Sequence, residues 1–240
     1  MFMHSPEAPQ RAIFDRSGLS DPADRSSLGS EARTLSSIVK GQKQICYSPK
    51  SIIFHEGDDS DSIYQLASGM VCLYRFLPNG RRLIARFLVA QDIVGLSFDE
   101  ECPFTAECVE PTTVYKIARS QVRTLCAHSP ALQNEVAMLL KTELTTERND
   151  ILPMMHLLAE GRVARLLLIL ARRGGASCNS GDRIQISMTR GDIADFIGLT
   201  TETVCRSFAK LRKAGLISAV SPDKVLIKNL PGLIAIAEGE

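Results

Sequence analysis

The segment from Thr189 to Gly215 constrains the fold most, because two helical patterns meet there at a single glycine. Ile193 and Ile197 are one helical turn apart, which predicts a short helix with one buried face. Thr189 is a suitable N-cap for this helix, since its hydroxyl can accept a hydrogen bond from a free backbone N–H. Gly198 follows at once and permits a tight turn.

A second helix is predicted from Thr200 or Thr201 to about Lys213. Its apolar residues recur at the spacing of one buried helix face: Val204, Phe208 and Leu211. Leu199 is expected to fill the angle between the two helices. Two helices joined by such a short glycine turn form a helix-turn-helix, whose second helix can enter the major groove of DNA.

The polar face of the second helix has the chemistry needed to recognise bases. Glu202 and Arg206 are one turn apart, so a carboxylate could accept from a cytosine amino group while a guanidinium donates to guanine. The alternative is a solvated salt bridge worth only about 0.3–0.5 kcal/mol. The glycine turn and the apolar spacing favour DNA recognition. The candidate DNA-binding residues are Thr189, Arg190, Thr200, Thr201, Glu202, Cys205, Arg206, Ser207 and Lys210.

The distribution of charge agrees with a DNA-binding C-terminal part, although weakly. The chain carries a net charge of +1, but residues 161–240 hold 12 Lys and Arg against 7 Asp and Glu. This basic C-terminal third is where a polyanion would bind. After Gly215, the segments 216–220 and 225–227 are predicted to form a hairpin around Ser221-Pro222-Asp223, in the position of a wing.

The N-terminal half has the pattern of a compact β domain. Residues 1–30 are rich in Ser, Pro and Asp and predict a flexible leader. Short apolar runs then alternate with turn residues, which predicts strands at 51–54, 62–66, 71–76, 83–88 and 113–117. In Pro78-Asn79-Gly80, we expect Asn79 and Gly80 to supply the positive φ angles of a tight hairpin.

A helix is predicted from Ser129-Pro130 to Leu158, with a kink at Pro153. Its apolar residues form a long stripe that suits a dimer contact between two copies. The alternative is that the stripe packs against the chain's own β domain. The candidate dimerisation residues are Val136, Leu140, Leu144, Ile151 and Met155. A further helix is predicted at 160–173 and an edge strand at 184–188.

Composition excludes several classes of protein. No apolar run is long enough to span a membrane and no secretory signal precedes residue 30, so we expect a cytoplasmic protein without a membrane partner. The 7 cysteines lack a C-x-x-C pair, which argues against a disulfide framework or a zinc site. The 4 histidines lie in unrelated segments and no catalytic motif is present, so an enzyme is not expected.

The run Met188-Thr-Arg-Gly-Asp-Ile-Ala-Asp-Phe-Ile-Gly-Leu-Thr-Thr-Glu-Thr-Val-Cys-Arg206 closely resembles the helix-turn-helix of the Crp/Fnr regulators. The resemblance covers about residues 40–230 and includes Ser62-Ile-Tyr, Ser68-Gly69 and Asp92-Ile-Val-Gly95. It implies an α+β fold with four parts. These are the leader (1–30), a β-roll (31–128), a dimerisation helix (129–158) and a winged helix-turn-helix domain (159–240).

In this family a Glu-x-x-Ser-Arg pattern marks Fnr-type proteins that read TTGA half-sites, and here it is Glu202-Thr-Val-Cys205-Arg206. The resemblance implies that Glu202 and Arg206 read the C and G, while Cys205 packs near the thymine methyl group. Thr201 stands where the cyclic-AMP receptor has an extra arginine. A homodimer on TTGA-N6-TCAA is therefore expected, with RNA polymerase as a further partner of an activator.

The family's usual effectors do not match this sequence. Cyclic-nucleotide-binding members hold the phosphate and the ribose with an Arg and a Glu, where this chain has Phe104 and Leu96. Fnr proteins hold an iron–sulfur cluster with N-terminal cysteines, but residues 1–45 contain none, and Tyr115 matches the remaining ligand position. His55 is interpreted as a turn residue rather than a haem ligand. No cyclic nucleotide, metal or other cofactor is therefore expected.

The remaining resemblance is to FixK-type members, which lack the cluster and act under low oxygen. Cys205 adds a redox hypothesis, since a thiol at the DNA interface can be oxidised; the alternative is a small residue in place of serine. Cys102 and Cys108 are interpreted as core or loop thiols. Two other functions stay open: a β-roll protein that needs an unidentified effector to bind DNA, and a sensor whose C-terminal part does not bind DNA.

Overall fold

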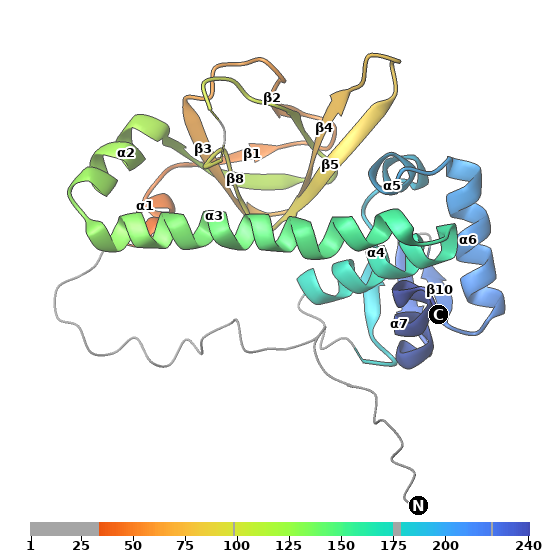
Figure 1. Ribbon diagram of the computed structural model, residues 1–240. Coiled ribbons are helices and arrows are strands. Elements are labelled where there is room, and N and C mark those ends of the chain that lie inside the picture. The colour runs from red at the N-terminus through yellow and green to blue at the C-terminus, as the bar shows by residue number, and fades with distance from the viewer. Residues whose placement is uncertain (1–33, 98, 175–178, 222) are drawn as a thin grey trace, which may run out of the picture. The chain divides into compact units, whose positions relative to one another are not determined.

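The computed structural model describes residues 34–97, 99–174, 179–221 and 223–240 (Figure 1). The predicted leader at 1–30 lies outside the described residues, as do Cys178 and Pro222. No helix among the described residues is long and apolar enough to cross a membrane. The domain boundaries predicted from the sequence stay predictions.

Two four-stranded antiparallel sheets form the N-terminal half, after the short helix α1 (Leu35–Lys40). The first sheet has the order β1 (Gln44–Tyr47), β8 (Thr112–Ala118), β3 (Ser62–Ser68) and β6 (Ile93–Val94). The second has the order β2 (Ile52–Phe54), β7 (Thr105–Cys108), β4 (Met70–Phe76) and β5 (Arg82–Val89). Residues from both sheets share one apolar cluster, including Leu66, Val71, Leu88 and Val114. The predicted β fold is thereby confirmed.

The turn between β4 and β5 differs from the predicted two-residue type. Gly80 has a φ of 76°, but Asn79 is not among the residues with positive φ, so that part of the prediction is wrong. The Leu77 N–H donates to the Arg81 carbonyl at 2.9 Å, and Gly80 N–H donates to the Leu77 carbonyl at 2.8 Å. The loop thus has three residues, of which only the last adopts the left-handed conformation.

A long helix follows the β strands. After α2 (Arg119–Ala127), the Ser129 hydroxyl caps α3 (Pro130–Ile151), which leads into a 3₁₀ segment, η3 (Leu152–His156). The α-helix therefore ends earlier than the predicted Leu158. Pro153 has no N–H to donate to the Asn149 carbonyl, and the Arg165 guanidinium donates to that carbonyl instead.

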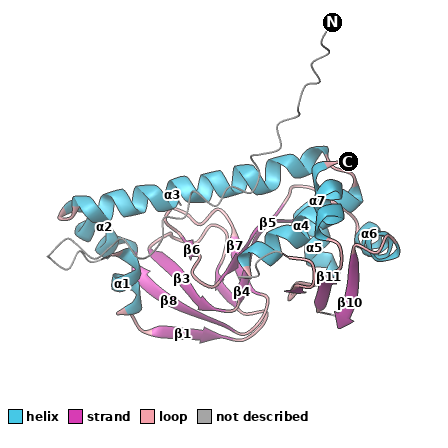
Figure 2. Ribbon diagram, turned by 90° about the horizontal axis from the view of Figure 1, so that it is seen from below, coloured by secondary structure: helices cyan, strands magenta, loops and turns pink. Residues whose placement is uncertain are grey.

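The C-terminal part combines four helices, two of which form the helix-turn-helix, with a small sheet. It comprises α4 (Ala159–Arg173), β9 (Arg183–Gln185), α5 (Arg190–Ile197), α6 (Thr201–Lys213), β10 (Ile217–Ser221), β11 (Lys224–Ile227) and α7 (Leu230–Glu238). The strand order is β10-β11-β9, so β9 is an edge strand as predicted, although it stops at Gln185. Figure 2 shows α6 beside the β10–β11 hairpin, which is the predicted wing.

Candidate nucleic-acid interface

A capping box fixes the start of α5. The Thr189 hydroxyl oxygen accepts from the Asp192 N–H at 3.0 Å, while Asp192 Oδ2 accepts from the Thr189 N–H at 3.0 Å and its hydroxyl at 2.7 Å. Both partners satisfy groups that a helix end leaves free. Ile193 and Ile197 are buried, as the sequence predicts. Thr189 therefore has a structural role as the N-cap in addition to its predicted contact with DNA.

The turn between α5 and α6 depends on Gly198, which adopts a left-handed conformation with φ 69° and ψ 38°. Arg162 of α4 supports the turn, because its guanidinium donates to the Ile197 carbonyl at 3.0 Å. Thr200 then caps α6 by accepting from the Thr203 N–H at 3.2 Å. The predicted helix, glycine turn and second helix are all confirmed.

The inner face of α6 is the predicted one. Val204, Phe208 and Leu211 are at most 5% exposed. Ser207 is also buried, with 1% exposure, so the prediction that it contacts DNA is wrong. Ser207 is three residues after Val204 and therefore shares its face of the helix.

The outer face of α6 presents the predicted base-reading pair. Arg206 Nη2 lies 2.5 Å from Glu202 Oε1, and both side chains are 72% exposed. An ion pair this exposed contributes little to stability. Breaking it so that each side chain can contact a base therefore costs little free energy. Thr200, Thr201 and Cys205 are exposed on the same side.

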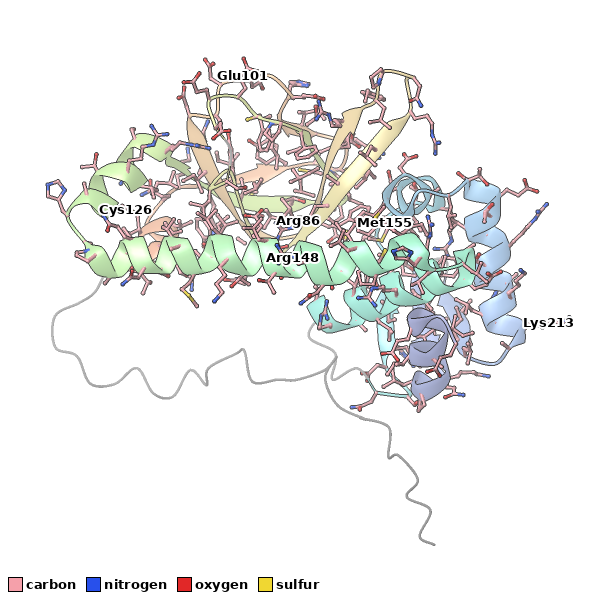
Figure 3. All side chains as sticks on the ribbon, viewed as in Figure 1. Arg86, Glu101, Cys126, Arg148, Met155 and Lys213 are labelled. Atoms are coloured by element: carbon pink, nitrogen blue, oxygen red, sulfur yellow. The ribbon has the colours of Figure 1, made fainter. Side chains whose placement is uncertain are left out.

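Lys210 is exposed but already has a partner. Its ammonium pairs with the Glu160 carboxylate of α4, and this hydrogen bond lowers the pKa of Glu160 below its ordinary value. Lys213, one turn further, points away from the protein at the end of α6 (Figure 3). Lys213 is therefore more readily available than Lys210 to bind a DNA phosphate.

Arg190 lies between the two helices and the wing. Its guanidinium is 3.8 Å from the centre of the Phe208 ring, a cation–π arrangement, and burial lowers its pKa. With Cys205 and Arg212 it lines a hollow of about 250 Å³ that reaches Val225 of β11. Arg212 is a second cation at this place.

Comparisons with known proteins agree with this geometry. Residues 161–236 match the Crp-like helix-turn-helix domain and residues 44–129 match the cyclic nucleotide-binding domain. The transcriptional activatory protein AadR of Rhodopseudomonas palustris is 33% identical over 77% of this chain and 77% of its own. The anaerobic regulatory protein of Haemophilus influenzae is 30% identical over 86% of this chain and 80% of its own.

The chain belongs to the Crp/Fnr family. The structure of FixK2 from Bradyrhizobium japonicum superimposes with a TM-score of 0.75 at 26% identity, covering 81% of this chain and 96% of that one. Crp/Fnr regulators bind DNA and act as dimers. The predicted family, α+β fold and DNA-binding regulatory function are thus confirmed.

The predicted dimerisation stripe of this Crp/Fnr regulator divides into two groups. Val136 packs against the chain's own core, beside Leu35 and Leu132, which is the alternative that the sequence left open. Leu144 and Met155 are 64% and 67% exposed. Met155 is labelled in Figure 3. Leu140 and Ile151 are half-buried and border, with them, an open apolar hollow of about 970 Å³. Two exposed apolar residues of the same region were missed: Met138 and Leu152.

The two positions that the resemblance aligns with contacts to a cyclic nucleotide carry apolar side chains. Leu96 packs against one apolar cluster and Phe104 against another, so neither side chain supplies a polar contact to a phosphate or a ribose. Tyr115, at the predicted position of an iron–sulfur ligand, has no thiolate to bind iron. Its hydroxyl accepts a hydrogen bond from the Gln44 side-chain amide at 2.8 Å. Cys102 and Cys108 are buried, and within the described ranges no group of His, Cys, Asp and Glu could hold a metal ion.

Proposed function

We propose that this Crp/Fnr regulator binds TTGA-N6-TCAA palindromes as a homodimer and activates transcription under low oxygen or a changed redox state. The observation that carries the proposal is the Glu202–Arg206 pair, which lies side by side on the exposed face of α6. AadR is named an activatory protein, which supports activation rather than repression. The Haemophilus relative is named an anaerobic regulatory protein, which supports low oxygen as the signal. RNA polymerase is the partner that activation requires.

The proposed role of each site residue follows from the hydrogen-bonding and apolar groups of its side chain. Arg206 donates two hydrogen bonds to the guanine edge, and Glu202 accepts one from the cytosine amino group. Cys205 packs against the thymine methyl group. The remaining candidates contact phosphates or the groove edge through hydroxyl and cationic groups: Thr189, Arg190, Thr200, Thr201 and Lys210. Lys210 must first release Glu160, so its contribution is smaller than its charge alone indicates.

The homodimer is proposed to form through α3 and η3. Leu144 and Met155 expose more than half of their apolar surface, and their neighbours Leu140 and Ile151 extend the same area. A second copy of the helix would remove this surface from water, which is the main driving force for such an association. Val136 is left out of this contact because it packs inward.

A second candidate is a regulator that binds DNA only with an effector. The open hollow of about 970 Å³ favours it, since its lining is mostly apolar and comes from β5, α3, η3 and the α5–α6 turn. A cyclic nucleotide is not the proposed ligand, because Leu96 and Phe104 lack the necessary polar groups. Measuring DNA binding without any added ligand tests whether an effector is required.

Fluorescence anisotropy of labelled duplexes tests the proposal. Without any added ligand, the protein is expected to bind TTGA-N6-TCAA more tightly than a duplex with one altered half-site base. Glu202→Ala should weaken only the first complex, whereas the control Lys213→Ala should reduce both affinities about equally through lost charge. Equal binding of both duplexes by the parent protein would contradict the proposed half-site.

A further inference from the structure

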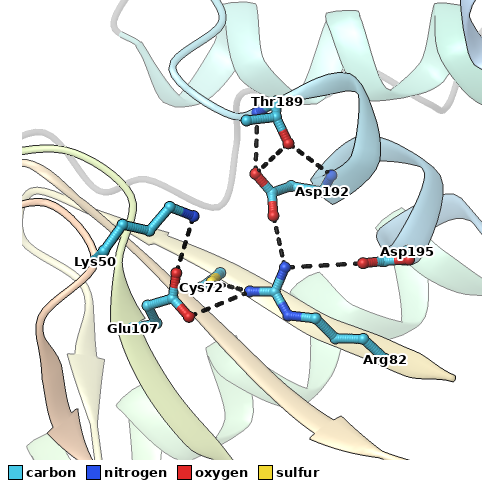
Figure 4. Close-up of polar contacts among 7 residues, drawn as sticks. All are labelled: Lys50, Cys72, Arg82, Glu107, Thr189, Asp192 and Asp195. Carbon is cyan, nitrogen blue, oxygen red and sulfur yellow. Dashed lines mark hydrogen bonds and ion pairs between the residues drawn. The ribbon is translucent and has the colours of Figure 1, made fainter. Parts of the chain in front are cut away.

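Arg82 makes an ion pair between the N-terminal β strands and the helix-turn-helix, where Phe87 of β5 also packs edge-on against Phe196 of α5. Arg82 begins β5, directly after the β4–β5 turn, and its Nη1 atom lies 2.6 Å from Asp192 Oδ1 (Figure 4). The same atom is 3.8 Å from Asp195 Oδ2, one turn further along α5. Arg82 and Asp192 are 110 residues apart in the sequence, so this contact joins the two halves of the chain.

Asp192 is not an ordinary surface carboxylate. Its side chain is only 5% exposed, and Oδ2 is already used by the capping box at Thr189. Arg82 therefore supplies the partner of the remaining oxygen. Burial raises the pKa of Asp192, but the hydrogen bonds from Thr189 and Arg82 outweigh burial, so that the pKa lies below its ordinary value.

The other side of Arg82 is held by β strands. Its Nη2 atom is 3.2 Å from the Cys72 sulfur and 3.7 Å from Glu107 Oε2, and its guanidinium carbon is 4.2 Å from the centre of the Tyr74 ring. Lys50 in turn binds Glu107 at 3.0 Å (Figure 4). Burial raises the pKa of Cys72 to about 11, so the sulfur is a neutral thiol. These contacts hold the Arg82 guanidinium in one orientation, with Nη1 directed at Asp192.

We infer that Arg82 is a positioning residue for DNA binding: it fixes the orientation of α5, and through the Gly198 turn that of α6, relative to the β strands. A largely buried ion pair contributes little net stability, because desolvation offsets its attraction, whereas setting a register is its best-attested use. In a dimer, this orientation determines the separation of the two α6 helices. The inference therefore rests on the proposed binding to a palindrome.

The spacing between half-sites measures this orientation directly. One base pair added or removed rotates a half-site by about 34° and moves it by about 3.4 Å along the duplex. If the α6 helices of the two copies are held rigidly, such a change should weaken binding strongly. If their orientation is free to vary, the affinity should depend less on the spacing. Base recognition within each half-site involves α6 alone and should be unaffected.

The experiment measures affinities of full-length protein for TTGA–TCAA duplexes with spacers of 5, 6 and 7 base pairs. The parent should prefer the 6-base-pair spacer, and Arg82→Gln should lose about tenfold of that preference while its discrimination against a one-base-altered half-site is retained. Arg82→Lys keeps the charge and should restore much of the preference. Arg81→Gln is the matched control, because Arg81 is the exposed neighbour with the same charge.

Asp192→Asn breaks the same ion pair but retains an amide oxygen for the cap, so it replaces Arg82→Gln if that variant does not fold. Spacer preference equal to that of the parent, in whichever of the two variants folds, would overturn the inference. If the parent itself does not distinguish the half-site, the proposed function fails separately. Hydrogen exchange without DNA then decides: faster exchange of the α5 amides in Arg82→Gln than in Arg81→Gln supports the inference, and equal rates refute it.

Discussion

Two glycines at the ends of α5 should respond oppositely to the same substitution. Gly198 has a φ of 69°, and the nearest atom to an added Cβ, Arg162 Nη1, would be 3.6 Å away. Space is therefore sufficient, and the cost of Gly198→Ala is the backbone strain of a left-handed alanine, about 1–2 kcal/mol. Gly191 is helical, and its Cβ would meet only Thr189 Oγ1 at 3.6 Å. Gly191→Ala should stabilise by up to about 1 kcal/mol.

Urea unfolding at fixed protein concentration measures both changes. The midpoint should fall for Gly198→Ala and rise for Gly191→Ala, while the slope of the free energy against urea stays constant. Gly198→Asn is the control for strain, because asparagine tolerates the left-handed region better than alanine and should lose less stability. Midpoints that move in the same direction for both alanine variants would refute the assignment of the helix and its turn.

Three other predictions concern association, pH and oxidation. Leu144→Lys should shift the protein toward monomer in sedimentation velocity because it places a charge in the proposed α3 contact, whereas Gln121→Lys on α2 should not; a dimer in both would contradict that contact. The stability that Asp192 provides should be complete above its unfolded pKa of about 3.9 and lost as pH falls through its lower folded pKa, so the destabilisation by Asp192→Asn should shrink toward zero in acid. Peroxide should weaken DNA binding by the parent but not by Cys205→Ser, since conversion of the thiol to sulfenic acid adds a polar oxygen at the base-contacting surface; equal loss in both proteins would remove Cys205 as the redox site.

The helix-turn-helix could be predicted from the sequence because its signals are local. The spacing of Ile193 and Ile197, the cap at Thr189 and the glycine at 198 each act within one or two turns of helix. Ser207 shows the limit of such reasoning. Its polarity favoured the outer face, but its position three residues after Val204 places it inside.

Other elements carried weak or distant signals. The strands β1, β6 and β7 have two to four residues each, too few for an alternating pattern to stand out. The helix α7 was missed although Asn229 and Pro231 form a typical N-cap and first turn. The Arg82–Asp192 contact has no local signal, because the two residues meet only through the tertiary fold.

The most direct test of base reading by α6 compares two proteins on two duplexes. The parent and Arg206→Ala are measured by anisotropy on TTGA-N6-TCAA and on the same duplex with each half-site guanine replaced. Because Arg206 is proposed to donate to that guanine, the replacement should cost the parent about 1–3 kcal/mol per half-site and cost Arg206→Ala almost nothing. If Arg206→Ala binds both duplexes more weakly but still distinguishes them as the parent does, Arg206 does not read the guanine and the proposed recognition is contradicted.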